Sequence, residues 1–433
     1  MEPEDISESV SDFATDHKLG HDKRIIETLN VIIKIENVCG LFRFAFVNGK
    51  LREPTWMMKM ISLFISITCA CLFFYVSINS FHINIDNISV ANFLNLICVV
   101  ATGTQYMVNI MTITFIFNST NICIITTLAN LDVKMKLENI KNFYKKSMLE
   151  SYKYVISIGI IQVVIISLDA LTINVAWALT AGMISFVQRL EIITFCKYID
   201  LLRRRLQIIN KYLKTFVNEQ DRKSETIFTI ETETIVTNDT ANLIGDASES
   251  NTKIRDLAQM YGMIAHTCSM IGKIFSLQIL TILISVFILL ITIMYNNLII
   301  YQTSMYVFGR TVNAIVSFSF WLFYFAFMSF KCERLLSVRN ETKILVNKII
   351  MNYDLPTTMR DQAKAFMQLV EAWPLRIHIY DMFSVDITLM LKFISVATTY
   401  FIIIIQVVNF SQIILVICFF PIFVYSNSLV LNK

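Results

Sequence analysis

Residues 384–409 read SVDITLMLKFISVATTYFIIIIQVVN, a predominantly apolar run in which Gln406 follows four isoleucines. A bilayer core of about 30 Å needs roughly 20 mainly apolar residues to cross it as a helix. The run is therefore long enough to span a membrane. A glutamine in lipid is costly unless it faces a partner or water. We therefore expect Gln406 to be a pore or gate residue. The alternative is that it bonds a neighbouring helix without contacting ions.

Other apolar runs of spanning length precede this one. The composition agrees, because 55% of the residues are apolar, only 16% are charged and the mean hydropathy is +0.59. None of the runs has the alternation of barrel strands, and backbone amides in lipid must bond within their own segment. The sequence predicts an all-α membrane protein with seven transmembrane helices, the first six at about 56–79, 89–117, 152–170, 173–200, 272–296 and 303–330.

The basic residues alternate between the connections and so indicate orientation. The N-terminal region and the connections at 118–151, 201–271 and 331–383 hold nearly all the Lys and Arg, whereas the loops at about 80–88, 171–172 and 297–302 hold none. Basic connections stay on the cytoplasmic side. We expect a cytoplasmic N-terminus, an extracellular C-terminus and an outward-running seventh helix.

Two cytoplasmic connections differ in character. Residues 217–252 are rich in Ser, Thr, Asp and Glu, which predicts a disordered insertion. The preceding fourth helix is expected to continue beyond the bilayer, because Leu202, Leu206, Ile209 and Leu213 fall on one stripe.

The 331–383 connection is expected to be helical. Its apolar positions suggest an amphipathic helix that ends near Pro356. Thr358 and Asp361 resemble a capping box for a second helix through Trp373, whose buried stripe would include Phe366 and Val370.

Polar residues in the outer half of the bundle are candidates for ligand binding. Sugars need paired hydrogen-bond donors and acceptors with an apolar or aromatic face. The residues that supply this inventory are Asp169, Asn174, Trp177, Arg310 and Asn313. An internal ion pair between Asp169 and Arg310, without a ligand, explains the two charges equally well. Arg189 and Glu191 lie deeper and are expected to bond neighbouring helices.

Nothing in the sequence indicates catalysis. The five histidines lack metal-ligand spacing, and no phosphate loop or nucleophile elbow is present. We expect neither enzymatic activity nor a cofactor or metal. The basic run 203–205 is better explained by contact with lipid headgroups than by nucleic-acid binding.

Residues 383–406 read FSVDITLMLKFISVATTYFIIIIQ, which resembles the C-terminal signature of insect gustatory receptors. That signature has Phe-x-hydrophobic-Asp, a spacer, Thr-Tyr, five hydrophobic residues and Gln. Thr399, Tyr400 and Gln406 match its core positions in type and spacing.

The resemblance implies a tetrameric, tastant-gated cation channel, homomeric or heteromeric, in the plasma membrane of gustatory neurons. Gln406 would line the pore near its gate, with Thr399 and Tyr400 lower on the same helix, and the tastant would be a sugar or a bitter compound. The implied parts are a cytoplasmic N-terminal region (1–55), a six-helix ligand-binding bundle (56–330), a cytoplasmic helical anchor (331–383), a pore helix (384–409) and an atypical apolar tail (410–433).

Two other functions are compatible with seven apolar helices. A receptor that couples to a G protein would have an external N-terminus, opposite to the orientation expected here. A small-molecule transporter is the second alternative, which the absence of an internal repeat makes weaker.

Overall fold

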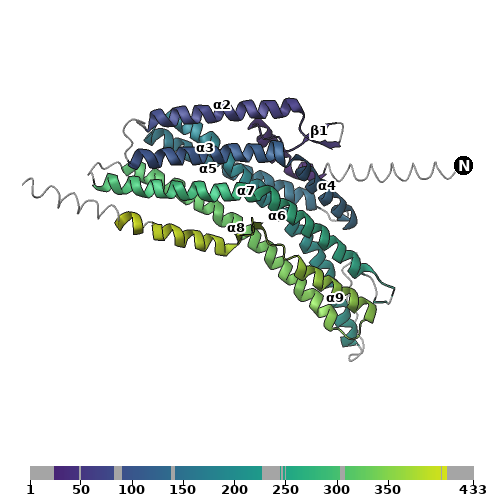
Figure 1. Ribbon diagram of the computed structural model, residues 1–433. Coiled ribbons are helices and arrows are strands. Elements are labelled where there is room, and N and C mark those ends of the chain that lie inside the picture. Colours follow the sequence, from purple (N-terminus) through teal and green to yellow (C-terminus); the bar gives the residue numbers. More distant parts are fainter. Residues whose placement is uncertain are drawn as a thin grey trace, which may run out of the picture.

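The computed structural model describes residues 24–47, 50–81, 90–137, 142–226, 244, 247–248, 250–302, 308–400 and 402–406. Within them, seven helices are long and apolar enough to cross a membrane. They lie side by side in one bundle, and three of them continue beyond it at one end (Figure 1). The predicted all-α membrane fold with seven spanning helices is confirmed. The expected tail at 410–433 lies outside the described residues.

The first three spans stay close to bilayer length. They are α2 (Trp56–Ser80), α3 (Val90–Met111), which continues through the π-helical turn η1 (Thr112–Ile116), and α5 (Phe143–Thr172). The helix α4 (Asn118–Lys134) follows η1. Before α2, a helix at residues 24–38 leads into a small hairpin of β1 (Ala45–Val47) and β2 (Lys50–Arg52).

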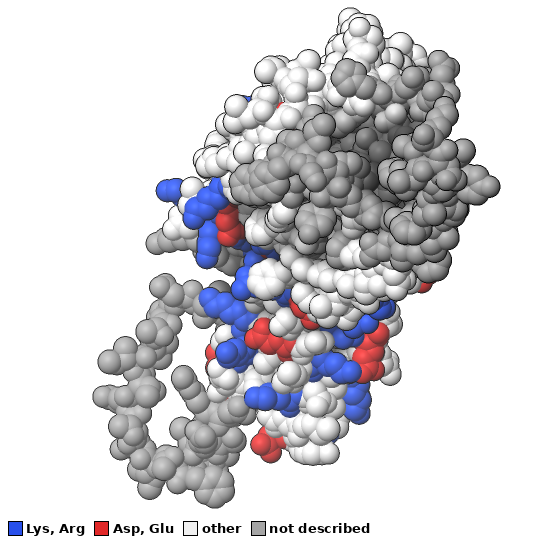
Figure 2. Space-filling model, turned by 90° about the vertical axis from the view of Figure 1, so that its left-hand side faces the viewer, with Lys and Arg blue, Asp and Glu red and all other residues white. Residues whose placement is uncertain are grey.

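The remaining helices are much longer than a bilayer requires. They are α6 (Val175–Thr226), α7 (Lys253–Gln302) and α8 (Phe308–Met351), and the short helix α9 (Thr357–Ala372) packs on the ends of α7 and α8. The predicted stripe of α6 is fully buried, with Leu202, Leu206, Ile209 and Leu213 each at 0% exposure. On the face shown in Figure 2, the charged side chains lie mainly over this extension, whereas few are visible over the spanning half.

A short strand pair connects α9 to the last span. Strand β3 (His378–Ile379) pairs with β4 (Phe383–Ser384), and the last helix then runs from Ile387 to Gln406. Only 6% of the most apolar stretch of this helix is buried, which is the smallest share among the seven spans of the described residues. It leaves the extension and runs along the outside of the bundle (Figure 1).

Buried ion pairs hold the middle of α6. Arg205 donates from Nε to Asp132 Oδ1 of α4 at 2.6 Å and from Nη2 to Asp132 Oδ2 at 2.7 Å, with both side chains at 0% exposure. Lys331 of α8 donates to Asp200 at 2.6 Å, and Tyr154 of α5 donates to the same carboxylate at 2.8 Å. Each pair joins α6 to a different neighbour, so α6 is the central helix of the fold.

The segment that precedes α2 is attached to the same helix. Arg43 donates from Nε to Glu36 Oε2 at 2.8 Å and from Nη2 to Glu191 of α6. Thr194 donates to the other oxygen of Glu36 at 2.6 Å. All four side chains are buried, so a polar cluster fixes residues 36–43 against the bundle.

Two details of the extension differ from the sequence prediction. Helix α9 begins at Thr357 with Pro356 at its N-cap and no side-chain cap bond, so the capping box of Thr358 and Asp361 is wrong. Proline at this place presets the backbone, and Asp361 instead accepts from Lys364 at 2.9 Å. The expected buried stripe is confirmed, since Phe366 and Val370 are at 0% exposure.

The structure contradicts the disorder expected at both ends of the insertion 217–252. Helix α6 continues through its first ten residues to Thr226. At its other end Ile244 is buried, and Gln362 of α9 donates to the carbonyl of Asn251 at 2.8 Å. The helical packing of Phe216 and Val217 carries α6 past the change in composition. Residues 227–243 lie outside the described part.

The Asp132–Arg205 pair makes a direct test of the packing around α6. Asp132→Asn leaves the Arg205 guanidinium buried without its counter-ion, which costs on the order of 3–5 kcal/mol. The exposed Asp361–Lys364 pair is the control, because breaking a surface pair costs at most about 1 kcal/mol. Thermal unfolding of detergent-purified protein should show a large loss for Asp132→Asn and almost none for Asp361→Asn. Equal midpoints would contradict the central place of α6.

Candidate functional site

A polar cluster lies inside the spanning half of the bundle, between α5 and α8. Asn313 of α8 donates from Nδ2 to Asp169 Oδ1 of α5 at 2.7 Å and to Thr172 Oγ1 at 2.9 Å. Asp169 is 7% exposed and Asn313 is 6% exposed. The structure therefore brings together two of the residues expected at a ligand site. The side chain of Arg310 lies outside the described residues, so its predicted pairing with Asp169 stays a prediction.

Arg189 of α6 is the charged neighbour that the structure does describe. It is 2% exposed and donates from Nη1 to Gln162 Oε1 of α5. The Gln162 amide nitrogen in turn donates to the carbonyl of Gly182 at 2.9 Å, which fixes the amide with its oxygen toward Arg189. The expectation that Arg189 bonds a neighbouring helix is confirmed.

Aromatic rings of α8 complete the surroundings of Arg189. Its guanidinium carbon lies 5.4 Å from the ring centroid of Trp321 and 5.9 Å from that of Tyr324. Cation–π contacts of this kind contribute roughly 2 kcal/mol when desolvated. Sequence reasoning did not find these aromatic contacts, because spacing along α6 does not reveal which rings of α8 face Arg189.

The other two residues predicted at the ligand site, Asn174 and Trp177, lie at the end of the bundle. Asn174, in the turn between α5 and α6, donates from Nδ2 to Ser80 Oγ of α2 at 2.7 Å and accepts from the backbone of Trp177 at 2.7 Å. The Trp177 ring meets Phe81 edge to face at 5.5 Å. Asn174 thus begins α6 and ties it to α2, rather than joining the Asp169 cluster.

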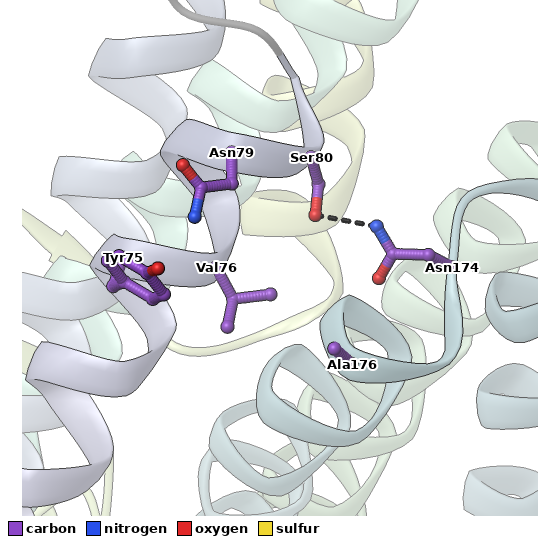
Figure 3. Close-up of a pocket in the computed structure, with 6 residues that line it drawn as sticks. All are labelled: Tyr75, Val76, Asn79, Ser80, Asn174 and Ala176. Atoms are coloured by element: carbon purple, nitrogen blue, oxygen red, sulfur yellow. Dashed lines mark hydrogen bonds between the residues drawn. The ribbon is translucent and has the colours of Figure 1, made fainter.

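A hollow opens beside this turn. Its volume is about 290 Å³, close to the lower limit of small-molecule pockets. Figure 3 shows the lining side chains and the Asn174–Ser80 bond across it, with the lining formed by Tyr75, Val76, Asn79, Ser80, Asn174 and Ala176.

One face of the last helix packs on its own bundle. Phe393 lies 6.3 Å from Phe287 of α7 and 5.7 Å from Phe325 of α8, and Tyr400 meets Phe287 edge to face at 5.2 Å. Phe393 and Tyr400 are seven residues apart and so share a face. Tyr400 is therefore directed toward α7.

Another face of the same helix carries its polar residues. Lys392, Thr399 and Gln406 recur at intervals of seven and form one stripe, with Ser395 beside it. All four are exposed in the single chain, and Thr399 bonds only back to the carbonyl of Ser395, at 3.0 Å. The stripe thus separates Thr399 and Gln406 from Tyr400, although the sequence signature groups all three.

Residues 29–408 match the family model described as 7tm Chemosensory receptor. The chain belongs to this family. Its fold is similar to that of the insect olfactory receptor OR5 from Machilis hrabei, with a TM-score of 0.60 at 15% identity over 90% of this chain and 99% of that one. The structure of OR5 in complex with eugenol gives a TM-score of 0.61 at 14% identity over the same shares. No curated protein matches the sequence.

In this chemosensory receptor Asp386 starts the last helix. Its Oδ1 accepts hydrogen bonds from the backbone of Thr388 at 2.9 Å and of Leu389 at 3.3 Å, and its Oδ2 accepts from Ser384 Oγ at 2.6 Å. Burial raises the pKa of this carboxyl, but the hydrogen bonds outweigh it and leave the pKa below its usual value. The sequence signature included Asp386, and the structure gives it a physical role as the N-cap.

The cap predicts how the receptor responds to substitution at Asp386. Asp386→Ala removes the acceptor and costs about 1 kcal/mol at the start of the helix, whereas Asp386→Asn keeps an acceptor and is nearly neutral. Hydrogen exchange of the Thr388 and Leu389 amides should become several-fold faster in Asp386→Ala only. Equal exchange in both variants would contradict the cap.

The same carboxyl predicts a dependence on pH. A lowered folded-state pKa contributes stability that is present above the unfolded value of about 3.9 and is lost as pH falls through the folded value. Protection of the Thr388 amide should therefore fall in acid in the wild type. Asp386→Asn does not titrate, so its protection should change less over the same range.

Proposed function

We propose that this chemosensory receptor is a subunit of a tastant-gated cation channel of the gustatory receptor type. The observation that carries the proposal is the exposure of the last helix. Only 6% of its most apolar stretch is buried. It exposes the polar stripe formed by Lys392, Ser395, Thr399 and Gln406. A polar stripe in hydrocarbon is unfavourable unless it meets protein or water. Copies of this helix around a central axis supply both.

The assembly that fits this stripe is a homo- or heterotetramer with a water-filled axis. Gln406 lies at the end of the stripe and forms the gate, with Thr399 two turns below it. Tyr400 supports the helix from outside the pore, where it packs on Phe287. With the orientation expected from the basic connections, the N-terminus lies in the cytoplasm and Gln406 lies near the outer surface of the membrane. In this proposal that membrane is the plasma membrane of gustatory neurons.

The ligand site in this proposal is the polar interior of the spanning half. Asp169, Asn313 and Arg310 serve a tastant with hydrogen-bonding groups, and Asn174 and Trp177 stand at the outer end, beside the hollow. The insect olfactory receptor OR5, whose fold is similar, has been solved in complex with eugenol, which supports a small-molecule ligand for this receptor. A sugar or a hydroxylated bitter compound suits this inventory.

Helix α8 connects the ligand site to the pore helix. Tyr324 borders the polar interior, and the next residue, Phe325, contacts Phe393 of the last helix at 5.7 Å. A ligand that shifts α8 in the open state would move the last helix directly. Only a higher affinity for the open state can drive this change.

The pore role of Gln406 predicts a change in selectivity. Gln406→Glu places a ring of carboxylates in the channel and should raise the permeability of divalent over monovalent cations, and Gln406→Ala should alter gating. Agonist-evoked currents in oocytes, with a panel of sugars and plant bitter compounds, measure both effects. Ile394→Ala is the control. Ile394 is five residues before Thr399 and therefore lies on the opposite side of the helix from the stripe, so the currents of this variant should match the wild type.

Unchanged selectivity and gating in both Gln406 variants would refute the pore assignment. Complete absence of agonist currents in the wild type, at normal surface expression, would refute the channel itself.

A further inference from the structure

Arg189 is a buried cation without a directly bonded anion. The ion pairs of the described residues join other cations, and none of them includes Arg189. Its described contacts are the neutral Gln162 amide and two aromatic rings. The charge of Asp169 acts on it only through space, because that carboxylate is bonded to Asn313. Burying a guanidinium costs several kcal/mol, and these contacts offset part of that cost.

Two buried polar groups here have no partner in the described part of the chain. One is Nε of the Arg189 guanidinium itself, and the other is the hydroxyl of Tyr324, whose ring centroid lies 5.9 Å from the guanidinium carbon. Both side chains are 2% exposed. The Nε group can only donate, and a phenol hydroxyl donates readily. Buried donors in native proteins are almost always bonded. The missing component is therefore an acceptor.

We propose that the ligand of this receptor carries a carboxylate, which Arg189 and Tyr324 bind. A carboxylate offers two acceptor oxygens, and its negative charge balances the positive charge of the Arg189 guanidinium. Trp321 provides an apolar surface for the body of the molecule, and Gln162, held by Gly182, keeps the guanidinium in place. The inference rests on the proposed function, since it takes this interior as the ligand site, and it requires that the tastant carry a carboxylate.

A neutral sugar satisfies the donors but leaves the charge unbalanced. Charge-assisted hydrogen bonds are roughly twice as strong as neutral ones, so the site should separate an acid from its amide of equal shape. This is the property that distinguishes the proposal from general polar binding. Tyr324 also precedes Phe325, which contacts the last helix, so an acid bound here lies next to the coupling described above.

Binding to the full-length protein in lipid nanodiscs tests the proposal without currents. The probes are 4-hydroxyphenylacetate, indole-3-acetate and octanoate at pH 7.5, each compared with its primary amide by calorimetry. We expect at least one acid to bind tenfold or more tightly than its amide. Arg189→Gln should abolish this preference. Tyr324→Phe, which keeps the ring and the packing, should weaken acid binding several-fold, and Tyr75→Phe, at the distant hollow, should not.

The outcomes separate this proposal from the channel. Equal binding of acid and amide in all three pairs, absence of acid binding, or an acid preference that survives both Arg189→Gln and Tyr324→Phe overturns the carboxylate site. Acid binding without current supports the site and refutes the channel. Currents evoked only by neutral sugars support the channel and refute the site.

Discussion

A buried polar side chain, whether in the spanning bundle or in the extension beyond it, must find its partner within the protein, and this constraint organises the receptor. Helix α6 satisfies it for its own charges through successive neighbours. Glu191 meets Arg43, Asp200 meets Lys331, and Arg205 meets Asp132. Each pair fixes a different segment against α6, so polar contacts specify the arrangement of helices that nonspecific apolar packing would leave undetermined.

The last helix meets this requirement on only one of its faces. Its aromatic face packs on Phe287 and Phe325. The stripe that ends in Gln406 is exposed, and among the described residues its Thr399 hydroxyl bonds only its own helix backbone. The incomplete satisfaction of one helix is the physical reason to expect further copies of the chain. The polar interior around Arg189 also has buried donors without a partner among the described residues, and there the proposed partner is a ligand.

Much of this fold could be read from the sequence, because membrane crossing imposes length and composition on every span. The stripe of Leu202, Leu206, Ile209 and Leu213 also predicted the extension of α6. The start of α9 was misplaced, because Pro356 and the Thr–Asp spacing favour neighbouring start positions and sequence alone does not rank them. The disorder expected at the start of the 217–252 connection was wrong, because packing of Phe216 and Val217 continues α6 into polar sequence.

The candidate sites were less predictable. Periodicity shows which residues share a helix face but not which helix lies opposite, so the bond of Asp169 to Asn313 and the rings around Arg189 required the structure. The same limit applies to the signature residues, since adjacent letters such as Thr399 and Tyr400 face different surroundings. Asp386 illustrates the reverse case, because its place before an apolar run is a helix-start signal that spacing alone could have revealed.

The most direct test of this account is a structure of the purified chain in lipid nanodiscs by cryo-electron microscopy. We predict four copies around one axis, with Lys392, Thr399 and Gln406 of each last helix directed toward that axis and Tyr400 on Phe287 of its own bundle. Single copies, or a last helix whose polar stripe faces the acyl chains, would contradict it.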